Sequence, residues 1–528
     1  MTLPLTPGML LDAASLTPAE RTVNRLAHKI AHTELELKRV DRYFTGDQPL
    51  AFLAPEVRQQ VGDRLTELVI NWPRVIVNTV NRRVRLEGFR VGTEGATDAA
   101  LWEIWRRSGM TTWGPLLQTD ALVHKIAFLS VWTDEEDGGS RIYPESAHQC
   151  AVEYKPGSQE VRAALKRYDD PDAGDHVATL FLPDEAIEYR LPMRTDAGAT
   201  LLPGARWAES GRTPNPLGVV PVVPIVNNPR LLNLDGESEL SDVMPLADAV
   251  NKLATDMMVV SEFHAEPRRY ATNLQLPSMD DEDSLERVRA QARAYWDALH
   301  AGATWLGGEG TTFGQFPEAN LDGFVKAIQL LTAQIAAVAG LPPHYLGINT
   351  DNPASADAIR SAESTLTERA REKHGLWGPA YCRAVTMAAA IDDGAPYREA
   401  AAAMTGLEAV WANPETSSKA QDADYVAKLL PLGVLDVEAA QERANIGPTE
   451  RAAIAARVEA AKATAATQDV EARMAQARQL QQRDGLTQEA ALAAVGLLAA
   501  ASLQSGTPTG PPVASGASAP SFGPSRDV

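Results

Sequence analysis

The sequence of 528 residues has few cysteines and a deficit of positive charge. Cys150 and Cys382 are the only thiols and lie far apart, so a disulfide framework is implausible, and we expect two buried thiols in a reducing compartment. With 69 acidic against 49 basic side chains, the formal net charge is -20. Because Lys and Arg contacts to phosphates supply most of the affinity for nucleic acids, this balance argues against a conventional DNA-binding protein.

Long apolar runs are also missing. No segment reaches about 18 uncharged apolar residues, and Pro4, Pro7 and Asp12 interrupt the N-terminal stretch. The sequence therefore predicts neither a membrane span nor a signal peptide, and we expect a soluble intracellular chain. A hydrophobic content of 45% is still enough for a large core, and the length is typical of about three domains.

The common catalytic motifs are absent from the sequence. It contains neither a Gly-x-x-x-x-Gly-Lys-Ser/Thr phosphate loop nor a Gly-x-Ser-x-Gly elbow. His28 and His32 stand one helical turn apart, as in zinc hydrolases, but Lys29 occupies the place of the general-base glutamate. We therefore expect no enzyme, no metal and no cofactor. A metal-dependent hydrolase built on the two histidines is the alternative from another class.

The most informative stretch is a helix, a loop and a second helix. Apolar residues recur at three- and four-residue steps from Leu321 to Val338, which predicts an amphipathic helix. Gly340, followed by two prolines, ends it. A loop follows, and the second helix begins near Asn352–Pro353 or near Ser355 and runs to about Ile391, with a kink expected at Pro379.

Positive charge is missing around this loop. No Lys or Arg occurs between Lys326 and Arg360. A glycine and prolines after a helix also make a plain turn, so on this feature alone the gap is either accidental or functional. The candidate contact residues in the loop are His344, Tyr345, Asn349, Asp351 and Asn352.

The remaining patterns predict an α+β, mainly helical fold. We expect helices at 17–44, 55–68, 75–84, 101–108, 113–125, 237–265, 417–430, 437–443 and 449–483, and within 396–413 a short helix that begins at Pro396 and precedes a strand. We expect strands at 88–91, 127–133, 151–154, 163–168, 177–182, 186–191 and 407–411, and an insertion with strands near 269–274 and 304–306 around a helix at 280–299. Pro245 is placed to kink the helix at 237–265.

Three features allow two interpretations each. The segment Val219–Val226 is an edge strand or an extended linker, because it holds two prolines. The acidic run Asp134–Gly139 is favoured as a hairpin turn over a cation site, because calcium-loop spacing is missing. Trp102, Trp105 and Trp113 provide bulk for a core or for an interface.

Several motifs taken together resemble a known family. Asn71–Pro73, Ser261–Phe263 and above all Gly340–Gly347 followed by Asn352–Ile359 are similar to tailed-bacteriophage portal proteins of the siphophage type. The resemblance covers about residues 17–460. It implies a head-to-tail connector ring, usually of twelve subunits, at one capsid vertex.

The resemblance also implies the activity and the partners. The terminase packages double-stranded DNA through such a ring, DNA is later ejected through it, and head-completion and tail proteins dock on it. The implied partners are other copies of the chain, double-stranded DNA, the terminase large subunit, the major capsid and scaffolding proteins and a head-completion adaptor, with no membrane. The implied location is the virion, after assembly in the host cytoplasm.

Carried onto this sequence, the portal fold has wing, stem, clip and crown regions. They are a flexible arm (1–16), the wing (17–236), a stem helix (237–265), the clip (266–320), a second stem helix (321–340), the tunnel loop (341–354), a long kinked helix (355–392), the wing return (393–416), the crown helices (417–503) and a disordered tail (504–528).

The missing cations fit this resemblance. A channel that conducts DNA must not hold it, because each phosphate neutralised by Lys or Arg adds affinity and therefore drag. The charge gap falls where the family has the loop nearest to DNA, so we expect this loop to sense or retain packaged DNA through weak contacts. The alternative within phage particles is another connector or minor head protein.

Overall fold

The structure is a computed structural model. It describes residues 16–49, 68–92, 97–134, 138–192, 207–265, 269–273, 310–315, 320–348, 356–415 and 419–496, with short gaps in the last range, and also residues 286, 289, 290 and 293. The chain divides into two compact units, Met1–Leu432 and Gly433–Val528. The α+β class is confirmed. The helix expected at 55–68, the strand at 304–306 and the tail lie outside the described residues, as does most of the helix expected at 280–299.

The first helix, α1 (Pro18–Thr45), begins and ends as its sequence dictates. The backbone N–H of Glu20 donates to Thr17 Oγ1 (3.2 Å), and that of Thr17 donates to Glu20 Oε2 (2.6 Å). This reciprocal capping satisfies two backbone donors that a helix start otherwise leaves without partners. Gly46 then ends the helix with a left-handed φ of 91°.

Three more helices lie in the described part of the N-terminal region. They are α3 (Trp72–Asn81), α4 (Ala99–Arg107) and α5 (Met110–His124), and α5 begins three residues before the expected start. The tryptophans take different roles. Trp105 is buried against Tyr381, with ring centroids 5.0 Å apart, whereas Trp113 is 52% exposed.

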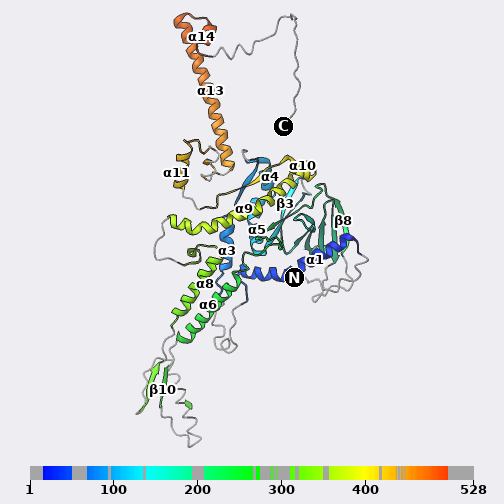
Figure 1. Cartoon of the computed structure of the whole chain (residues 1–528), viewed down its shortest axis with the longest axis vertical. Helices are drawn as coiled ribbons and strands as arrows, with labels where there is room; N and C mark the ends of the chain where they lie inside the picture. The colour runs from blue at the N-terminus through cyan, green and yellow to red at the C-terminus, as the bar shows by residue number, and fades with distance from the viewer. Residues whose placement is uncertain are drawn as a thin grey trace, which may run out of the picture. The chain divides into compact units, whose positions relative to one another are not determined.

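Two antiparallel sheets follow. The first has the order β3-β2-β9, from β2 (Ile126–Thr133), β3 (Ser140–Ser146) and β9 (Val222–Val226), and the second has the order β4-β5-β6-β7-β8. The second contains β4 (Cys150–Tyr154), β5 (Val161–Asp170), β6 (Asp175–Phe181), β7 (Glu185–Pro192) and β8 (Ala208–Pro214). One face of α1 packs on this sheet through Val23, Leu26 and Ile30 (Figure 1).

The sheets resolve several open points. β9 is an edge strand beside β2, where the missing N–H of Pro224 is tolerated. The backbone N–H of Asp134 donates to the carbonyl of Gly139 (2.7 Å) between β2 and β3, as expected of a hairpin turn. β3 and β8 were not predicted. Every residue of β8 is exposed, so its side chains show no alternation.

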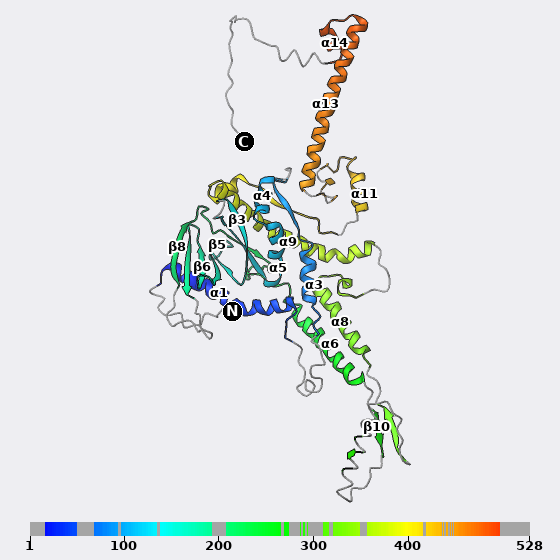
Figure 2. The ribbon, with the colours of Figure 1, turned by 180° about the vertical axis from the view of Figure 1, so that it is seen from behind.

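Two helices, α6 (Met244–Ala265) and α8 (Asp322–Val338), pack side by side (Figures 1 and 2). The predicted start of α6 at Glu237 is wrong by seven residues, because residues 239–243 form turns. Pro245 consequently lies in the first helical turn, where its missing N–H costs nothing, and not in the interior. Beyond α6, β10 (Arg269–Thr272) pairs with β11 (Thr312–Gln315), a strand that was not predicted.

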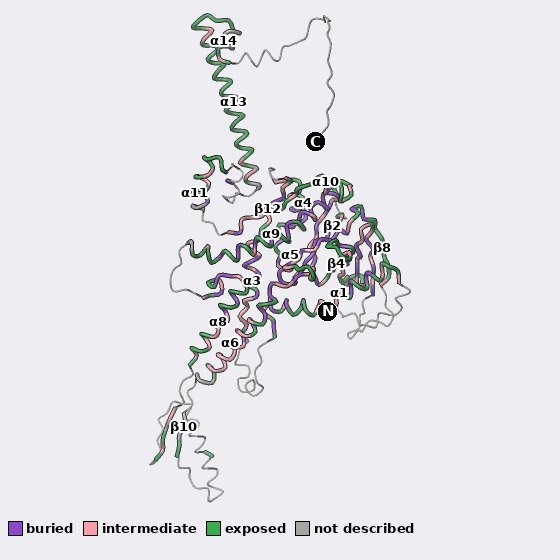
Figure 3. The backbone as a smooth tube through the Cα atoms, viewed as in Figure 1, coloured by how far each residue is buried: buried purple, intermediate pink, exposed green. Residues whose placement is uncertain are grey.

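The helix α9 (Ala356–Asp392) is continuous, with Pro379 inside it. Its burial increases toward its C-terminal end (Figure 3), where all but one of residues 381–390 are buried, and Leu366, Trp377 and Tyr381 are all at 0% exposure. It is followed by α10 (Tyr397–Ala403) and β12 (Leu407–Trp411). β12 returns to pair with β1 (Leu86–Val91), which ties the two halves of the first unit together.

The C-terminal helices match the predictions in part. α11 (Lys419–Leu429) belongs to the first unit, and α13 (Pro448–Asp484) and α14 (Gln488–Ala494) belong to the second. The helix expected at 437–443 lies largely outside the described residues. Both cysteines are free and buried, as predicted. Within the described part of the chain, every helix is too short or too polar to span a bilayer.

Candidate functional site: the junction of α6, α8 and α9

The turn after α8 holds the first two of the five candidate loop residues. Gly340 takes a left-handed φ of 62°, and the chain then forms a short 3-10 helix, η3 (Pro343–Leu346). His344 is exposed, and its ring lies 4.9 Å from that of Tyr345. Asn349, Asp351 and Asn352 lie outside the described residues.

Tyr345 is directed into the subunit. Its hydroxyl donates to Glu363 Oε1 of α9 (3.0 Å) and accepts from Arg83 Nη2 (3.1 Å). Arg83 is also ion-paired with Glu363 (3.1 Å), whose side chain is only 7% exposed. Tyr345 therefore anchors the start of the loop to α9, and His344 is the ring in this turn that faces solvent.

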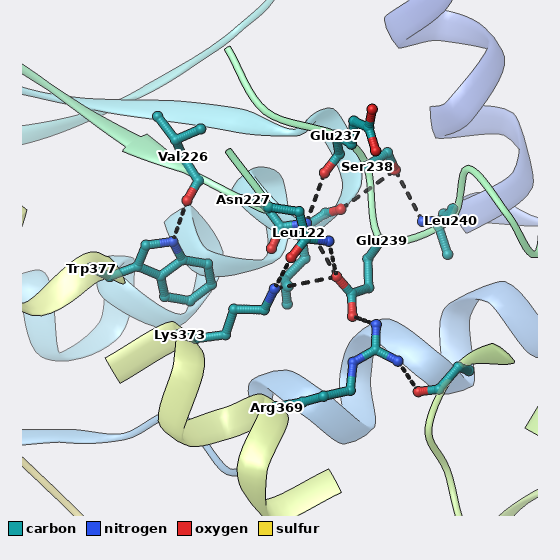
Figure 4. Close-up of polar contacts among 12 residues, drawn as sticks. Leu122, Val226, Asn227, Glu237, Ser238, Glu239, Leu240, Arg369, Lys373 and Trp377 are labelled. Carbon is teal, nitrogen blue, oxygen red and sulfur yellow. Dashed lines mark hydrogen bonds and ion pairs between the residues drawn. The ribbon is translucent and has the colours of Figure 1, made fainter. Parts of the chain in front are cut away.

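A larger polar network lies at the start of the α6 segment (Figure 4). Its centre is the carboxylate of Glu239, whose side chain is fully buried. Glu239 Oε2 accepts from the side-chain amides of Asn227 and Asn228, both at 3.1 Å, and lies 3.5 Å from Lys373 Nζ. Its other oxygen accepts from Arg369. A buried carboxylate needs such donors, because it has lost its water.

Arg369 also reaches the end of α8. Besides Glu239, its guanidinium donates to the carbonyl of Ala339, the C-cap residue of α8. That carbonyl is one of the last in the helix, which have no partner within it, and a cation at the negative end of the helix dipole is favourable. One side chain of α9 thus joins the end of α8 to the segment that leads into α6.

The charges at this junction depend on one another. Burial alone raises the pKa of the Glu239 carboxyl, but the charges of Lys373 and Arg369 and the two asparagine amides outweigh it, so its pKa lies below the usual value. Burial lowers the pKa of the Lys373 ammonium, and the charge of Glu239 opposes that change. The buried charges are therefore stable only as a set.

Backbone geometry adds to this junction. Trp377 Nε1 donates to the carbonyl of Val226 (2.9 Å), at the end of β9. Gly236 has a φ of 76°, and a Cβ there would lie 2.1 Å from the carbonyl oxygen of Asn227. A Cβ at Gly340 would lie 3.1 Å from Arg369 Cδ. The left-handed φ favours glycine at both positions, and at Gly236 the close contact with a backbone oxygen requires it as well.

The sequence analysis missed this network. A signal was present in α9, where Arg369, Lys373 and Trp377 follow one another at four-residue steps and so share one face. Two cations on a face that also carries a tryptophan indicate buried partners. The partners were not identifiable, because Glu239 lies 130 residues before Arg369.

The histidine pair of the alternative hydrolase lies on the exposed side of α1. The rings of His28 and His32 are stacked, with centroids 6.2 Å apart, and Lys29 between them is ion-paired with Asp235 (2.7 Å). Among the residues that the structure describes, no group of three or more His, Cys, Asp or Glu side chains is arranged to hold a metal ion. The polar contacts of the α6–α8–α9 junction hold the start of the loop that follows α8 against α9.

The chain is similar to a protein family, to two curated proteins and to solved structures. A family model described as phage portal protein, SPP1 Gp6-like, matches residues 26–444. The portal protein of Mycobacterium phage L5 is 31% identical over 392 residues, which cover 72% of this chain and 76% of that protein. The portal protein of Mycobacterium phage D29 is 28% identical over 389 residues, with the same coverage. A chain of the native gene transfer agent virion aligns over 76% of this chain and 96% of its own length, at 13% identity and a TM-score of 0.42.

Proposed function

Because this chain belongs to the SPP1 Gp6-like family of phage portal proteins, we propose that its copies form a ring at one capsid vertex and that double-stranded DNA passes through the centre. The ring has twelve subunits and remains in the virion after assembly in the host cytoplasm. The terminase large subunit, the capsid and scaffolding proteins and a head-completion adaptor bind it from outside.

The regions of the chain take the following roles in this proposal. The wing comprises residues 17–236 and the return at 393–416. The stem is formed by α6 and α8, the clip by residues 266–320, and the crown by residues 417–503. The tunnel loop, residues 341–354, faces the DNA, and α9 carries it.

The observation that carries the proposal is the combination of a fixed base and a missing positive charge. Tyr345 and Arg369 tie the chain on the N-terminal side of the loop to α9. The sequence from Lys326 to Arg360 supplies no Lys or Arg that would bind phosphate. A loop on a rigid base without cations suits contact with a duplex that has to move, and His344, Asn349, Asp351 and Asn352 supply weak polar contacts there.

The surface of α8 supports a ring. Val325, Leu330 and Val338 are 43%, 62% and 48% exposed in the single subunit. Apolar side chains on an exposed stem helix indicate a surface that neighbouring copies cover.

The ring is tested with the purified full-length chain. Negative-stain images and the particle mass are expected to give a closed ring with a central hole and a mass of about twelve subunits. Monomers or short filaments at micromolar concentration would contradict the proposal.

The role of the loop is tested by adding charge. We expect Asn349→Lys combined with Asn352→Lys to slow DNA packaging into heads severalfold, because two new phosphate contacts per subunit add drag. The matched control is Asn24→Lys on the exposed face of α1, which should package normally. Normal packaging by the loop variant would show that the loop does not approach DNA.

A further inference from the structure

Arg83, between α3 and β1, lies where three segments that are distant in sequence meet. Its side chain is 13% exposed. Nη2 lies 3.1 Å from Glu363 Oε2 of α9 and donates to the hydroxyl of Tyr345 in η3 (3.1 Å). Nη1 donates to the carbonyl of Pro414 (2.7 Å). One guanidinium thus contacts the turn after α8, the helix α9 and the chain that follows β12.

The chain from Ala412 to Glu415 leads from β12 toward α11, and we name it the α11 connector. The backbone N–H of Ala412 donates to the carbonyl of Arg85 (2.8 Å), and that of Glu415 donates to Asn413 Oδ1 (3.1 Å). The side chain of Glu415 is also ion-paired with Arg371 of α9. The α11 connector therefore follows a defined path beside the start of β1.

The hydroxyl of Tyr345 determines how Arg83 and Glu363 meet. It donates to Glu363 Oε1 (3.0 Å), and the guanidinium pairs with the other oxygen, Oε2. An arginine and a carboxylate often form a bidentate pair, in which two parallel N–H···O bonds hold both groups in one plane. Because the hydroxyl occupies a position on Oε1, the guanidinium is instead turned so that Nη1 reaches the carbonyl of Pro414.

We infer that Arg83 couples the position of Tyr345 to the α11 connector. When the hydroxyl moves away, an acceptor position opens on Glu363 Oε1, and the guanidinium turns to form the bidentate pair. This turn draws Nη1 away from the carbonyl of Pro414 and loosens the α11 connector. An outside contact reaches Tyr345 through the exposed His344, whose ring lies 4.9 Å away. The inference goes beyond the proposed function, because it concerns contacts within one subunit and depends on neither a ring nor DNA.

Hydrogen exchange in the purified full-length chain tests this coupling. Tyr345→Phe keeps the ring and removes the hydroxyl. We expect the amides of the α11 connector to exchange about tenfold faster than in the wild type, because a hydrogen bond from a charged donor is lost there. Unchanged exchange in the α11 connector would overturn the inference.

The matched control is Tyr43→Phe. It also removes a tyrosine hydroxyl that donates to a carboxylate, Asp248 Oδ2 (2.7 Å), but it lies on α1. It should leave exchange in the α11 connector unchanged. Equal acceleration by both variants would show that the α11 connector responds to any loss of stability, and would also overturn the inference.

A double-mutant cycle separates coupling from two independent losses. Arg83→Lys keeps a positive charge beside Glu363 but replaces the planar fork with a compact ammonium, which cannot alternate between the two arrangements. We expect Arg83→Lys alone to accelerate exchange in the α11 connector, and Tyr345→Phe to add less than about twofold in that background. The same acceleration by Tyr345→Phe in both backgrounds would overturn the inference.

A structure of the Tyr345→Phe chain gives the geometry directly and does not require the Arg83 variant to fold. We expect two N–H groups of the guanidinium on Glu363, and more than about 3.5 Å between Nη1 and the carbonyl oxygen of Pro414. An Nη1 that still donates to Pro414 would overturn the inference. That result would leave the proposed function intact, because the particle mass and the negative-stain images test the ring separately.

Discussion

Arg369 of α9 is ion-paired with Glu239, which lies 130 residues earlier in the chain and carries a fully buried carboxylate. The same guanidinium binds the carbonyl of Ala339 at the end of α8. The start of the loop at 341–354 is therefore positioned by a charge network inside the subunit.

The first prediction concerns this network. Glu239→Gln leaves Lys373 and Arg369 without their buried counter-charge, and we expect it to lower the free energy of unfolding by about 3–5 kcal/mol. Glu368→Gln, which removes an exposed partner of Arg371, should cost less than about 1 kcal/mol. Urea unfolding monitored by tryptophan fluorescence measures both. Equal losses would mean that the buried ion pair contributes no more to the free energy of unfolding than the exposed one.

The second prediction concerns Tyr345. Tyr345→Phe keeps the ring and removes the hydroxyl between Glu363 and Arg83, so we expect a loss of about 1–2 kcal/mol in the free energy of unfolding. His344→Phe, at the exposed neighbouring position, should change it by less than about 0.5 kcal/mol. If Tyr345→Phe were as stable as the wild type, the hydroxyl would not anchor the loop.

The third prediction compares two glycines with similar backbone angles. Gly236→Ala places a Cβ 2.1 Å from the carbonyl oxygen of Asn227, and we expect it to destabilise by more than about 3 kcal/mol. Gly347 has a φ of 79° with open space around it, so Gly347→Ala should cost only about 1 kcal/mol of backbone strain. Thermal unfolding of the two variants tests this difference, and similar melting temperatures would refute it.

The fourth prediction is a pH dependence. His374 is stacked on Trp411, with ring centroids 4.6 Å apart, and burial lowers its pKa from 6.5 to about 4. The unfolded chain binds this proton below about pH 6.5 and the folded chain only below about pH 4, so stability is complete at neutral pH and falls as the pH decreases between these values.

After a discount for partial exposure of the ring, the expected loss is about 2 kcal/mol. His374→Phe keeps the stacking and removes the titrating group. Its urea-unfolding midpoint should therefore change less between pH 7.5 and pH 4.5 than the midpoint of the wild type does. A wild-type midpoint that is constant over this range would contradict the prediction.

The elements that sequence analysis placed correctly are those with a local cause. Thr17 and Glu20 cap α1 because they lie three residues apart, and Gly340 ends α8 because it can adopt a left-handed φ. Of the two interpretations that the prolines of Val219–Val226 left open, the edge strand is the one observed, as β9. The strand β8 was missed because its side chains are exposed on both faces, which removes the alternation that identifies a strand.

The start of α6 shows where local rules stop. Apolar spacing predicted a helix from Glu237, but the backbone N–H of Glu239 donates to the carbonyl of Leu122 in α5 (2.9 Å), so this segment is held by another helix and α6 begins at Met244. Contacts outside the local segment also decide that the Tyr345 hydroxyl points into the subunit, because its partners Arg83 and Glu363 belong to other elements.

The sequence by itself determined the α+β class and the main helices, because periodicity and caps act over a few residues. The charge gap between Lys326 and Arg360 and the resemblance to portal proteins are also properties of the sequence alone. Only the tertiary structure decided that Glu239, Arg369 and Lys373 share one buried network and that Leu231 and Leu232 stay in solvent. Burial depends on which distant segments meet, and no local pattern contains that information.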